Sequence, residues 1–147
     1  MQFRIIVGDN VSPRINREFS NYIFDRMKRD LHKLVKHYHK KYEVREKYIL
    51  KSSLIKWKGK VPSHLDLPYY IENCLILSYV QGTYVIRINP KQVIKGSLTP
   101  VKLLIKMLEY GTTIVPAFPM LRRLFRWYSE NYLNLLPEFM EERMNIL

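Results

Sequence analysis

The stretch LEYGTTIVPAFPMLRRLFRWY, residues Leu108 to Tyr128, decides how the second half of the chain folds. Apolar residues at helical spacing lead up to Gly111, and glycine takes a left-handed C-terminal cap without the steric cost of a side chain. Pro116 and Pro119 then favour extended conformations in the residues before them, because the proline ring clashes with a helical neighbour. Helical spacing resumes at Leu121. The sequence therefore predicts a helix, a sharp joint and a second amphipathic helix that carries arginines.

The joint between these two helices is expected to be stiff. Gly111 reverses the chain, and the hydroxyls of Thr112 and Thr113 can bond the backbone groups that the helix end leaves free. The two prolines limit the conformations of the crossing, so that the second helix leaves at a defined angle. An ordinary connection between two packed helices follows the same pattern, and this alternative stays open at this point.

A long amino-terminal helix is the strongest element outside this stretch. Ser12 is a good N-cap, Pro13 suits the first helical position, and the periodicity continues through Tyr42. One face of this helix is apolar: Ile15, Phe19, Tyr22, Ile23, Met27, Leu31, Leu34, Val35 and Tyr38. The opposite face is cationic: Arg14, Arg17, Arg26, Lys28, Arg29, Lys33, Lys36, Lys40 and Lys41. Such a face is either solvated or a surface that meets phosphate or carboxylate groups.

The middle of the chain predicts a small antiparallel sheet. Residues 71–80 and 83–90 read as the two strands of a hairpin that turns at Gln81 and Gly82. In the second strand, Ile86 and Ile88 share a packed face with Tyr84, whereas Val85, Arg87 and Asn89 share a face that should be wet. Residues 2–7 suggest one further short strand.

The remaining segments complete the predicted order of elements. Residues 44–60 are ambiguous between a short helix and a bent extended segment, and residues 61–70 read as loop. Thr99 is expected to cap the helix that ends at Gly111, and Pro137 opens a last, acidic helix. The sequence therefore predicts a single α+β domain over residues 1–147, with a long amino-terminal helix and carboxyl-terminal helices packed on a small antiparallel sheet.

The charge balance indicates an acidic partner. The 147 residues include 25 lysines and arginines against 13 aspartates and glutamates, a net charge of +12. Nucleic acid, an anionic membrane surface and an acidic protein are all compatible with this charge. No apolar run approaches the roughly 20 residues of a membrane span, and the chain opens with no signal-peptide pattern. We therefore expect a soluble protein that is made in a reducing cytoplasm and does not bind membranes.

Several kinds of chemistry find no support in the sequence. Cys74 is the one cysteine, which excludes an intrachain disulfide and a zinc site built from cysteine pairs, and it is expected within a buried strand. No phosphate-binding loop and no nucleophile motif is present. His32, His37 and His39 lack metal-ligand spacing. We therefore expect no cofactor, no metal and no enzymatic activity.

Two minor alternatives remain. A metal-dependent nuclease would need Asp66, Glu72 and Glu109 to converge, which no spacing demands. Trp57 and Trp127, each next to basic residues, could stack on unpaired bases, although aromatic residues at helical spacing more often belong to a core.

The joint resembles the carboxyl-terminal signature of the phage tail-completion or head-tail neck proteins, which runs roughly EFGTxxxPARPFLRPA. The positions that match it in order are Glu109, Tyr110, Gly111, Thr112, Pro116, Ala117, Pro119, Leu121 and Arg122. The predicted order of elements is also similar to that of the family. Two departures are Phe118, where members usually have arginine or histidine, and residues 61–73, which lack the family's PVDTGxLRxS segment.

The resemblance implies a structural virion protein without a catalytic step. Such a protein is assembled in the host cytoplasm into a homo-oligomeric ring at the head-tail junction, between the portal or connector and the tail tube or its terminator. Its cationic surface would contact DNA in the lumen without reading bases, or dock on acidic neighbours. Candidate residues for these contacts are Arg26, Lys28, Arg29, Lys33, Lys36, Arg122, Arg123, Arg126 and Trp127. The main alternative is a nucleic-acid-binding protein whose amino-terminal helix lies along phosphates.

Overall fold

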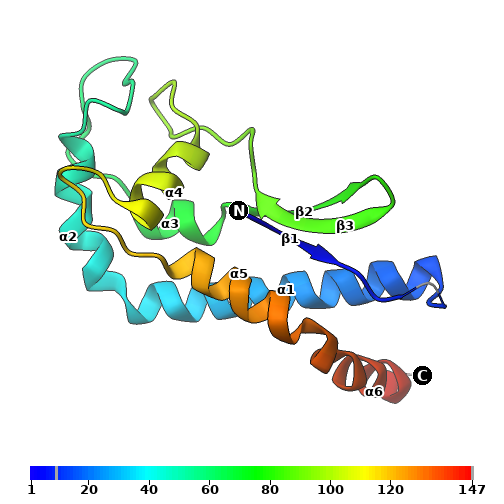
Figure 1. Ribbon diagram of the computed structural model, residues 1–147. Coiled ribbons are helices and arrows are strands. Elements are labelled where there is room, and N and C mark those ends of the chain that lie inside the picture. The colour runs from blue at the N-terminus through cyan, green and yellow to red at the C-terminus, as the bar shows by residue number, and fades with distance from the viewer. Residues whose placement is uncertain (9, 147) are drawn as a thin grey trace.

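The computed structural model describes residues 1–8 and 10–146 and confirms the α+β class (Figure 1). The elements follow in the order β1 (Gln2–Ile5), α1 (Pro13–His37), α2 (His39–Leu50), α3 (Leu67–Glu72), β2 (Leu75–Val80), β3 (Thr83–Ile88), α4 (Val101–Tyr110), α5 (Met120–Asn131), the 3-10 helix η1 (Tyr132–Leu135) and α6 (Leu136–Ile146). The buried residues form one cluster to which the sheet and each of the helices contribute.

The sheet is antiparallel with the strand order β1-β3-β2, so that β3 is the central strand. The β2–β3 hairpin turns at Gln81 and Gly82, as predicted, and both residues have positive φ angles, 51° and 79°. Two consecutive residues of this kind match the right-handed twist of the flanking strands. The register pairs Leu75 with Ile88 and places Gln2 opposite Arg87.

The second face of the sheet is not as wet as predicted. Ile86 and Ile88 are buried in the core, but Val85, on the other face, is only 2% exposed. Val85 lies on the central strand between Arg4 and Ser78, and the side chain of Arg87 bends over to donate to Ser78 Oγ at 3.2 Å. Long neighbours on a narrow sheet therefore shield Val85, and Ile76 and Val80 of β2 are half-buried on the same face.

The predicted helix through Tyr42 is two helices that change direction at Tyr38. The N–H of Tyr38 still donates to Leu34 O at 2.9 Å, but its φ and ψ angles of −100° and 23° end α1. The Tyr38 ring packs edge-on against Phe118, with centroids 5.3 Å apart. This contact accompanies the turn of α2 towards the joint (Figure 1). Helix α2 continues to Leu50 and takes up the first part of the segment that the sequence left ambiguous.

The segment predicted as a loop over residues 61–70 contains the start of α3. Asp66 is its N-cap and accepts a hydrogen bond from Tyr69 N at 3.3 Å, and Pro68 lies in the first turn. The strand predicted from residue 71 begins only at Leu75, after this helix. Cys74 is fully buried, as expected, but lies just before the strand.

Thr99 does not cap α4. Pro100 is the N-cap of α4, and Thr99 Oγ1 instead accepts a hydrogen bond from Lys56 N at 2.7 Å. The hydroxyl thereby joins two segments that lie far apart in the sequence, which a local capping rule does not anticipate.

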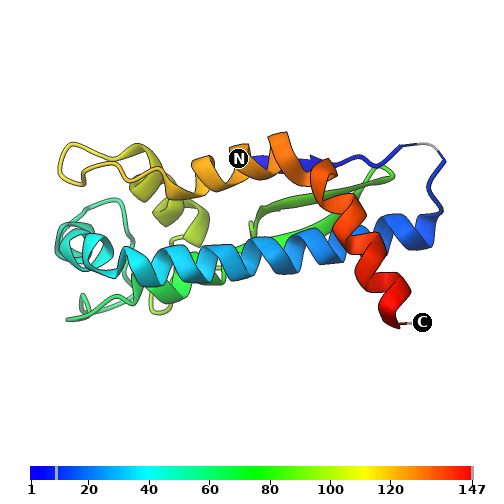
Figure 2. The ribbon, with the colours of Figure 1, turned by 90° about the horizontal axis from the view of Figure 1, so that it is seen from below.

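The molecule is elongated along α1, with α5 running beside it (Figure 2). Helix α1 contacts β2 and β3, while α5 contacts β1. The loops after α2 and after β3 lie together at one end, and α6 lies at the opposite end (Figure 1). The Tyr128 hydroxyl of α5 donates to Asp30 of α1, which connects the two helices near their middle.

Candidate functional site

The joint begins at Gly111, whose conformation only glycine adopts easily. Its φ is 76°, which confirms the predicted positive φ, but its ψ of 171° lies outside the left-handed helical region. The N–H of Gly111 donates to Met107 O at 2.9 Å. A Cβ at this position would lie 2.9 Å from both Ala117 N and Val115 O. Conformation and crowding therefore both require glycine here.

Thr112 closes the turn that follows. Its Oγ1 accepts hydrogen bonds from Ile114 N at 3.2 Å and Val115 N at 3.0 Å, and its own N–H donates to Val115 O at 2.9 Å. The predicted role of the threonine hydroxyls thus holds for Thr112, whereas Thr113 is exposed to solvent. The crossing is also bonded back to α4, because Phe118 N donates to Leu108 O at 2.6 Å.

Glu109 connects the two helices of the joint through its carboxylate. The side chain is buried, and Oε1 accepts a hydrogen bond from Arg122 N at 2.7 Å in the first turn of α5. Helix α5 has no side-chain cap from Pro119, so this carboxylate meets the free N–H groups and the positive end of the helix dipole. Burial raises the pKa of Glu109, while the N–H and the positive charge of Arg122 act in the opposite direction.

Arg122 completes this connection. The sequence suggested Arg122 as a residue that contacts DNA or a neighbouring subunit, but its guanidinium makes contacts within the joint. Its Nη2 donates to the carbonyl oxygen of Glu109 at 2.6 Å. Its guanidinium lies 4.0 Å from the ring centroid of Tyr110, a cation–π contact at the surface. Arg122 therefore holds the end of α4 against the start of α5.

Arg45 of α2 is the residue of the joint that sequence reasoning missed. It is only 8% exposed, and its guanidinium donates to Pro116 O at 2.9 Å and Ala117 O at 3.3 Å. The same group donates to Lys41 O and lies over the Phe118 ring. No local pattern marks Arg45 as part of the joint, because its partners there, Pro116 and Ala117, lie some seventy residues further along the chain.

The structure thus brings the residues predicted for the joint into one unit. Glu109 and Arg122 form its hydrogen-bonded base, Gly111 and Thr112 form its turn, and the carbonyls of Pro116 and Ala117 accept from Arg45. Pro119 is the N-cap residue of α5, and the ring of Tyr110 is exposed beneath Arg122.

An apolar groove of about 370 Å³ lies beside the joint, between α1 and α5. It is lined by Leu34, Tyr38, Phe118, Met120, Arg123, Leu124 and Trp127. Trp127 is 46% exposed, and Arg123 and Arg126 are exposed on the same helix. Two of the predicted contact residues, Arg123 and Trp127, therefore line a hollow that can receive an apolar side chain.

The cationic face of α1 is partly neutralised by α6. Arg26 Nη1 donates to Glu138 Oε2 at 2.8 Å, so this predicted contact residue already has an acidic partner within the chain. Lys28 lies 3.6 Å from Asp25. Glu142 faces Lys28, Arg29 and Lys33 across a shallow hollow, and Arg143 pairs with Glu18. Arg29, Lys33 and Lys36 remain exposed.

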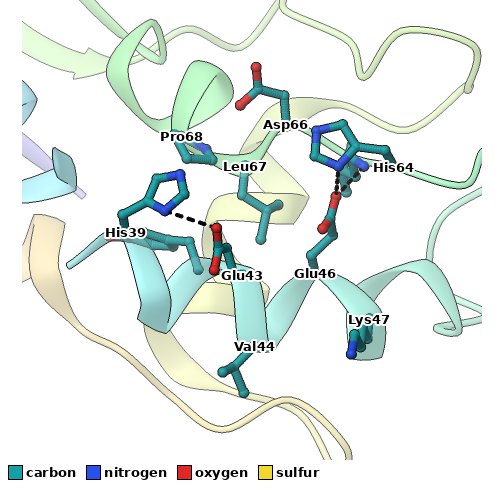
Figure 3. Close-up of a pocket in the computed structure, with 11 residues that line it drawn as sticks. His39, Glu43, Val44, Glu46, Lys47, His64, Asp66, Leu67 and Pro68 are labelled. Carbon is teal, nitrogen blue, oxygen red and sulfur yellow. Dashed lines mark hydrogen bonds and ion pairs between the residues drawn. The ribbon is translucent and has the colours of Figure 1, made fainter.

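Two histidine–glutamate pairs lie along α2 in a cleft of about 580 Å³ (Figure 3). His39 Nδ1 is 3.1 Å from Glu43 Oε1, and His64 Nδ1 is 2.5 Å from Glu46 Oε1. Glu46 also accepts from Leu65 N, so it holds the following loop in place. Within residues 1–8 and 10–146, no group of three or more such side chains is arranged to hold a metal ion.

The three carboxylates of the nuclease alternative serve separate purposes. Glu109 is buried in the joint, Asp66 caps α3, and Glu72 lies 3.0 Å from His32 Nδ1. They do not form a common site.

A second cleft, of about 770 Å³, lies on the other side of residues 64–66 and is called here the Trp57 cleft. It is lined by Trp57, Pro62, His64, Leu65, Asp66, Tyr69, Tyr70, Gln92, Val93 and Lys95. The two segments that flank it, residues 51–65 and 89–100, are called here the lysine loops. They carry Lys51, Lys56, Lys58, Lys60, Lys91 and Lys95, all exposed.

No known protein family, curated protein or solved structure matches this chain. In the part of the chain that the structure describes, no helix combines the length and the apolar character needed to cross a bilayer.

Proposed function

We propose that this chain is a structural virion protein of the head-tail neck, which assembles into a ring between the portal or connector and the tail. The observation that carries the proposal is the joint. The residues that match the neck-protein signature, including Glu109, Gly111, Thr112 and Arg122, are the ones that hold α4 and α5 together. The match therefore falls on residues that have a structural role, although an ordinary connection between packed helices follows the same local pattern.

The joint supports ring assembly because it fixes the direction of α5. A closed ring needs the same angle between every pair of neighbouring copies. The apolar groove beside the joint offers a socket whose position on the molecule is equally fixed. Trp127 and Arg123, at this groove, are residue types that dominate the binding energy of interfaces.

The occupant that we propose for the groove is the acidic end of a second copy. Helix α6 carries Glu141 besides the two glutamates that face α1, and Met144 on it is 70% exposed. The groove is lined by Leu34 and Tyr38 near the carboxyl end of α1. Helix α6 lies towards the other end of the molecule (Figure 1). Arg123 at the groove and the glutamate side chains of α6 carry opposite charges. They favour a head-to-tail contact, which closes into a ring when the rotation between copies permits.

Localisation in the particle is the direct test. The expected result is that purified virions contain this chain, and that electron microscopy of intact particles shows it as a ring between portal and tail. A phage from which the gene is deleted should produce heads without attached tails. Complete, infectious virions without this chain would overturn the proposal.

The groove is tested separately by Trp127→Glu, with Tyr48→Glu as the matched control. Tyr48 is 43% exposed on α2 and lines none of the described clefts, so it accepts the same charge at a similar exposure. Trp127→Glu should place a carboxylate in the socket and prevent tail attachment in a complementation assay, whereas Tyr48→Glu should restore it. Equal restoration by both variants would exclude the groove as the contact.

The alternative function, a protein that binds nucleic acid along its phosphates, draws less support from α1 than the sequence suggests. Arg26 and Lys28 already have acidic partners, and Glu142 faces the same surface. The observation that favours a nucleic-acid contact is the group of exposed lysines on the lysine loops.

A further inference from the structure

We propose that the Trp57 cleft and the lysine loops form a binding site for single-stranded nucleic acid, in which an unpaired base stacks in the cleft and the lysines contact phosphates. This inference does not depend on the neck function and would hold for a free protein as well.

The lysine loops form one connected platform. Lys58 N donates to Gly96 O at 3.0 Å and Leu98 N donates to Lys56 O at 2.8 Å, on either side of the bridge between Trp57 and Ser97. Figure 1 shows the two loops side by side at one end of the molecule. The lysines that flank Trp57 are therefore held in place by backbone pairing, and a strand that binds there meets an ordered surface.

The platform carries positive charge with little to oppose it. Residues 47–65 and 73–108 contain no aspartate or glutamate. None of the six lysines of the lysine loops forms an ion pair with any residue that the structure describes. Asp66 lies at the edge of the cleft, where it caps α3. This arrangement differs from the face of α1, where α6 supplies acidic partners.

The cleft supplies aromatic surface between these charges. Trp57 is half-buried, and Tyr69 is 54% exposed beside Tyr70, with ring centroids 5.4 Å apart. The hydroxyl of Tyr70 accepts from Lys95 N at 2.9 Å, which ties the aromatic wall to the second lysine loop. A cleft of about 770 Å³ is of the size that holds small organic ligands.

Polar atoms in the wall also favour a ligand with hydrogen-bonding groups. Trp57 Nε1 and Gln92 Oε1 are buried and have no partner among the described residues. Both residues line the cleft, and a base offers donors and acceptors on its edge. An apolar ligand would leave these atoms unsatisfied.

The aromatic cleft and the exposed lysines together favour single strands over duplex. Stacking on an aromatic side chain needs a base that is not already stacked within a duplex, and this contact is tolerant of sequence because every base has a π-face. Lysines contact phosphates without regard to sequence, and this contribution weakens as salt rises. The site is therefore expected to bind single strands with little preference for sequence.

The first experiment uses Trp57 as its own reporter. The chain has two tryptophans, so the full-length Trp127→Phe variant emits from Trp57 alone. Titration with an oligothymidylate of about 12 nucleotides, a length within known site sizes, should quench this emission. A duplex of the same length should bind more weakly and leave the emission unchanged. Binding of both oligonucleotides with equal affinity, or binding without quenching, would overturn the proposal.

The second experiment compares two double variants of equal charge. Lys56→Ala/Lys58→Ala should weaken oligothymidylate binding about tenfold and reduce the slope of log K against log salt by about 1.4, the share of two lysines on a single strand. Lys33→Ala/Lys36→Ala, on exposed positions of α1, should change neither. Equal losses in both would show attraction by net charge alone and would contradict a local site.

The third experiment asks whether Trp57 stacks on a base or only supports the fold, and whether the ligand is nucleic acid or an acidic protein. Trp57→Leu should lose about tenfold in affinity, while Trp57→Phe should keep most of it, because a phenyl ring still stacks. Equal losses in both variants would overturn the proposal in favour of a structural role for Trp57. Displacement of the oligonucleotide by polyglutamate at the same charge concentration would overturn it in favour of an acidic peptide as the ligand.

Discussion

The joint and the lysine loops both bring together residues from distant parts of the chain. They differ in their charged side chains, which are bonded within the protein in the joint and exposed to solvent on the lysine loops. In the joint, Arg45 and Arg122 are committed to carbonyl oxygens of their own chain, and Glu109 bonds the first turn of α5. On the lysine loops, backbone atoms make the contacts, and the lysine side chains stay exposed. The joint therefore has the properties of a rigid support and the lysine loops those of a binding surface.

One glycine in each region, Gly111 in the joint and Gly96 in a lysine loop, shows the same difference. Gly111 and Gly96 have nearly equal φ angles, 76° and 78°. A Cβ at Gly111 would collide with backbone atoms, whereas a Cβ at Gly96 would meet nothing within 4 Å. Similar backbone strain is therefore expected at both sites, and additional crowding only in the joint.

The largest expected effect is that of Gly111→Ala. Strain at a positive φ costs about 1–3 kcal/mol, and contacts with backbone atoms that cannot move freely add to it, so we expect a loss of about 3 kcal/mol or more in the free energy of unfolding. Gly96→Ala should show the strain alone, about 1 kcal/mol. Urea unfolding of both variants measures the difference. A smaller loss at Gly111 than at Gly96 would mean that the joint is soft.

A somewhat smaller loss is expected from Arg45→Met, which keeps much of the side-chain volume and removes the hydrogen bonds to Pro116 and Ala117. A charge-assisted hydrogen bond of this kind contributes about 1.5–3 kcal/mol, and the two carbonyls lose their donor. Lys47→Met, on an exposed position of the same helix, is the control and should lie within about 0.5 kcal/mol of the original protein. Thermal unfolding resolves this gap, because 1 kcal/mol shifts Tm by about 2–4 °C at this chain length. Similar Tm values for the two variants would refute the role of Arg45.

The next effect depends on pH and concerns Glu109. Its pKa in the folded protein lies above the ordinary value of 4.5, so the folded state holds the proton over a pH range in which the unfolded chain has released it. The stability that this group contributes therefore falls as pH rises from 4.5 to the folded-state pKa and is constant above it. Glu109→Gln lacks this titration. The difference in unfolding free energy, original protein minus variant, should decline across that window, and parallel pH profiles would contradict the raised pKa.

The smallest effect on stability is expected on the lysine loops. Lys56→Ala/Lys58→Ala removes no side-chain hydrogen bond that the structure describes, so its unfolding free energy should stay within about 0.5 kcal/mol of the original. Urea unfolding of the double variant measures this directly. A large loss would place these lysines in the support of the fold and remove the contrast with the joint.

The predictions from sequence succeeded where the physical cause is local. Gly111 was identified because a positive φ at a helix end selects glycine, and Ser12 accepts a hydrogen bond from Ile15 N as an N-cap does. The turn at residues 81–82 follows from the same kind of argument. These elements depend on neighbours within four residues, which the sequence displays directly.

The predictions failed where a distant partner decides the outcome. Thr99 Oγ1 accepts a hydrogen bond from Lys56 N instead of capping α4. The bond of Arg45 to the crossing before α5 and the pairing of Arg26 with Glu138 are contacts that the sequence does not predict. Nothing within the sequence window of any of these residues indicates its partner. The start of α3 is a different kind of failure, because Asp66 before Leu67 and Pro68 is a local helix signal, whereas the prediction for these residues is a loop.

The thiol of Cys74 is a built-in probe of local opening in this protein. Its Sγ is fully buried, donates to Ile71 O at 3.1 Å, and has a pKa that burial raises to about 12. A thiol in this state does not react with alkylating reagents until the junction between α3 and β2 opens. With one cysteine in the chain, the rate of modification reports that opening alone, and so shows whether it is quicker or slower than the unfolding of the whole molecule.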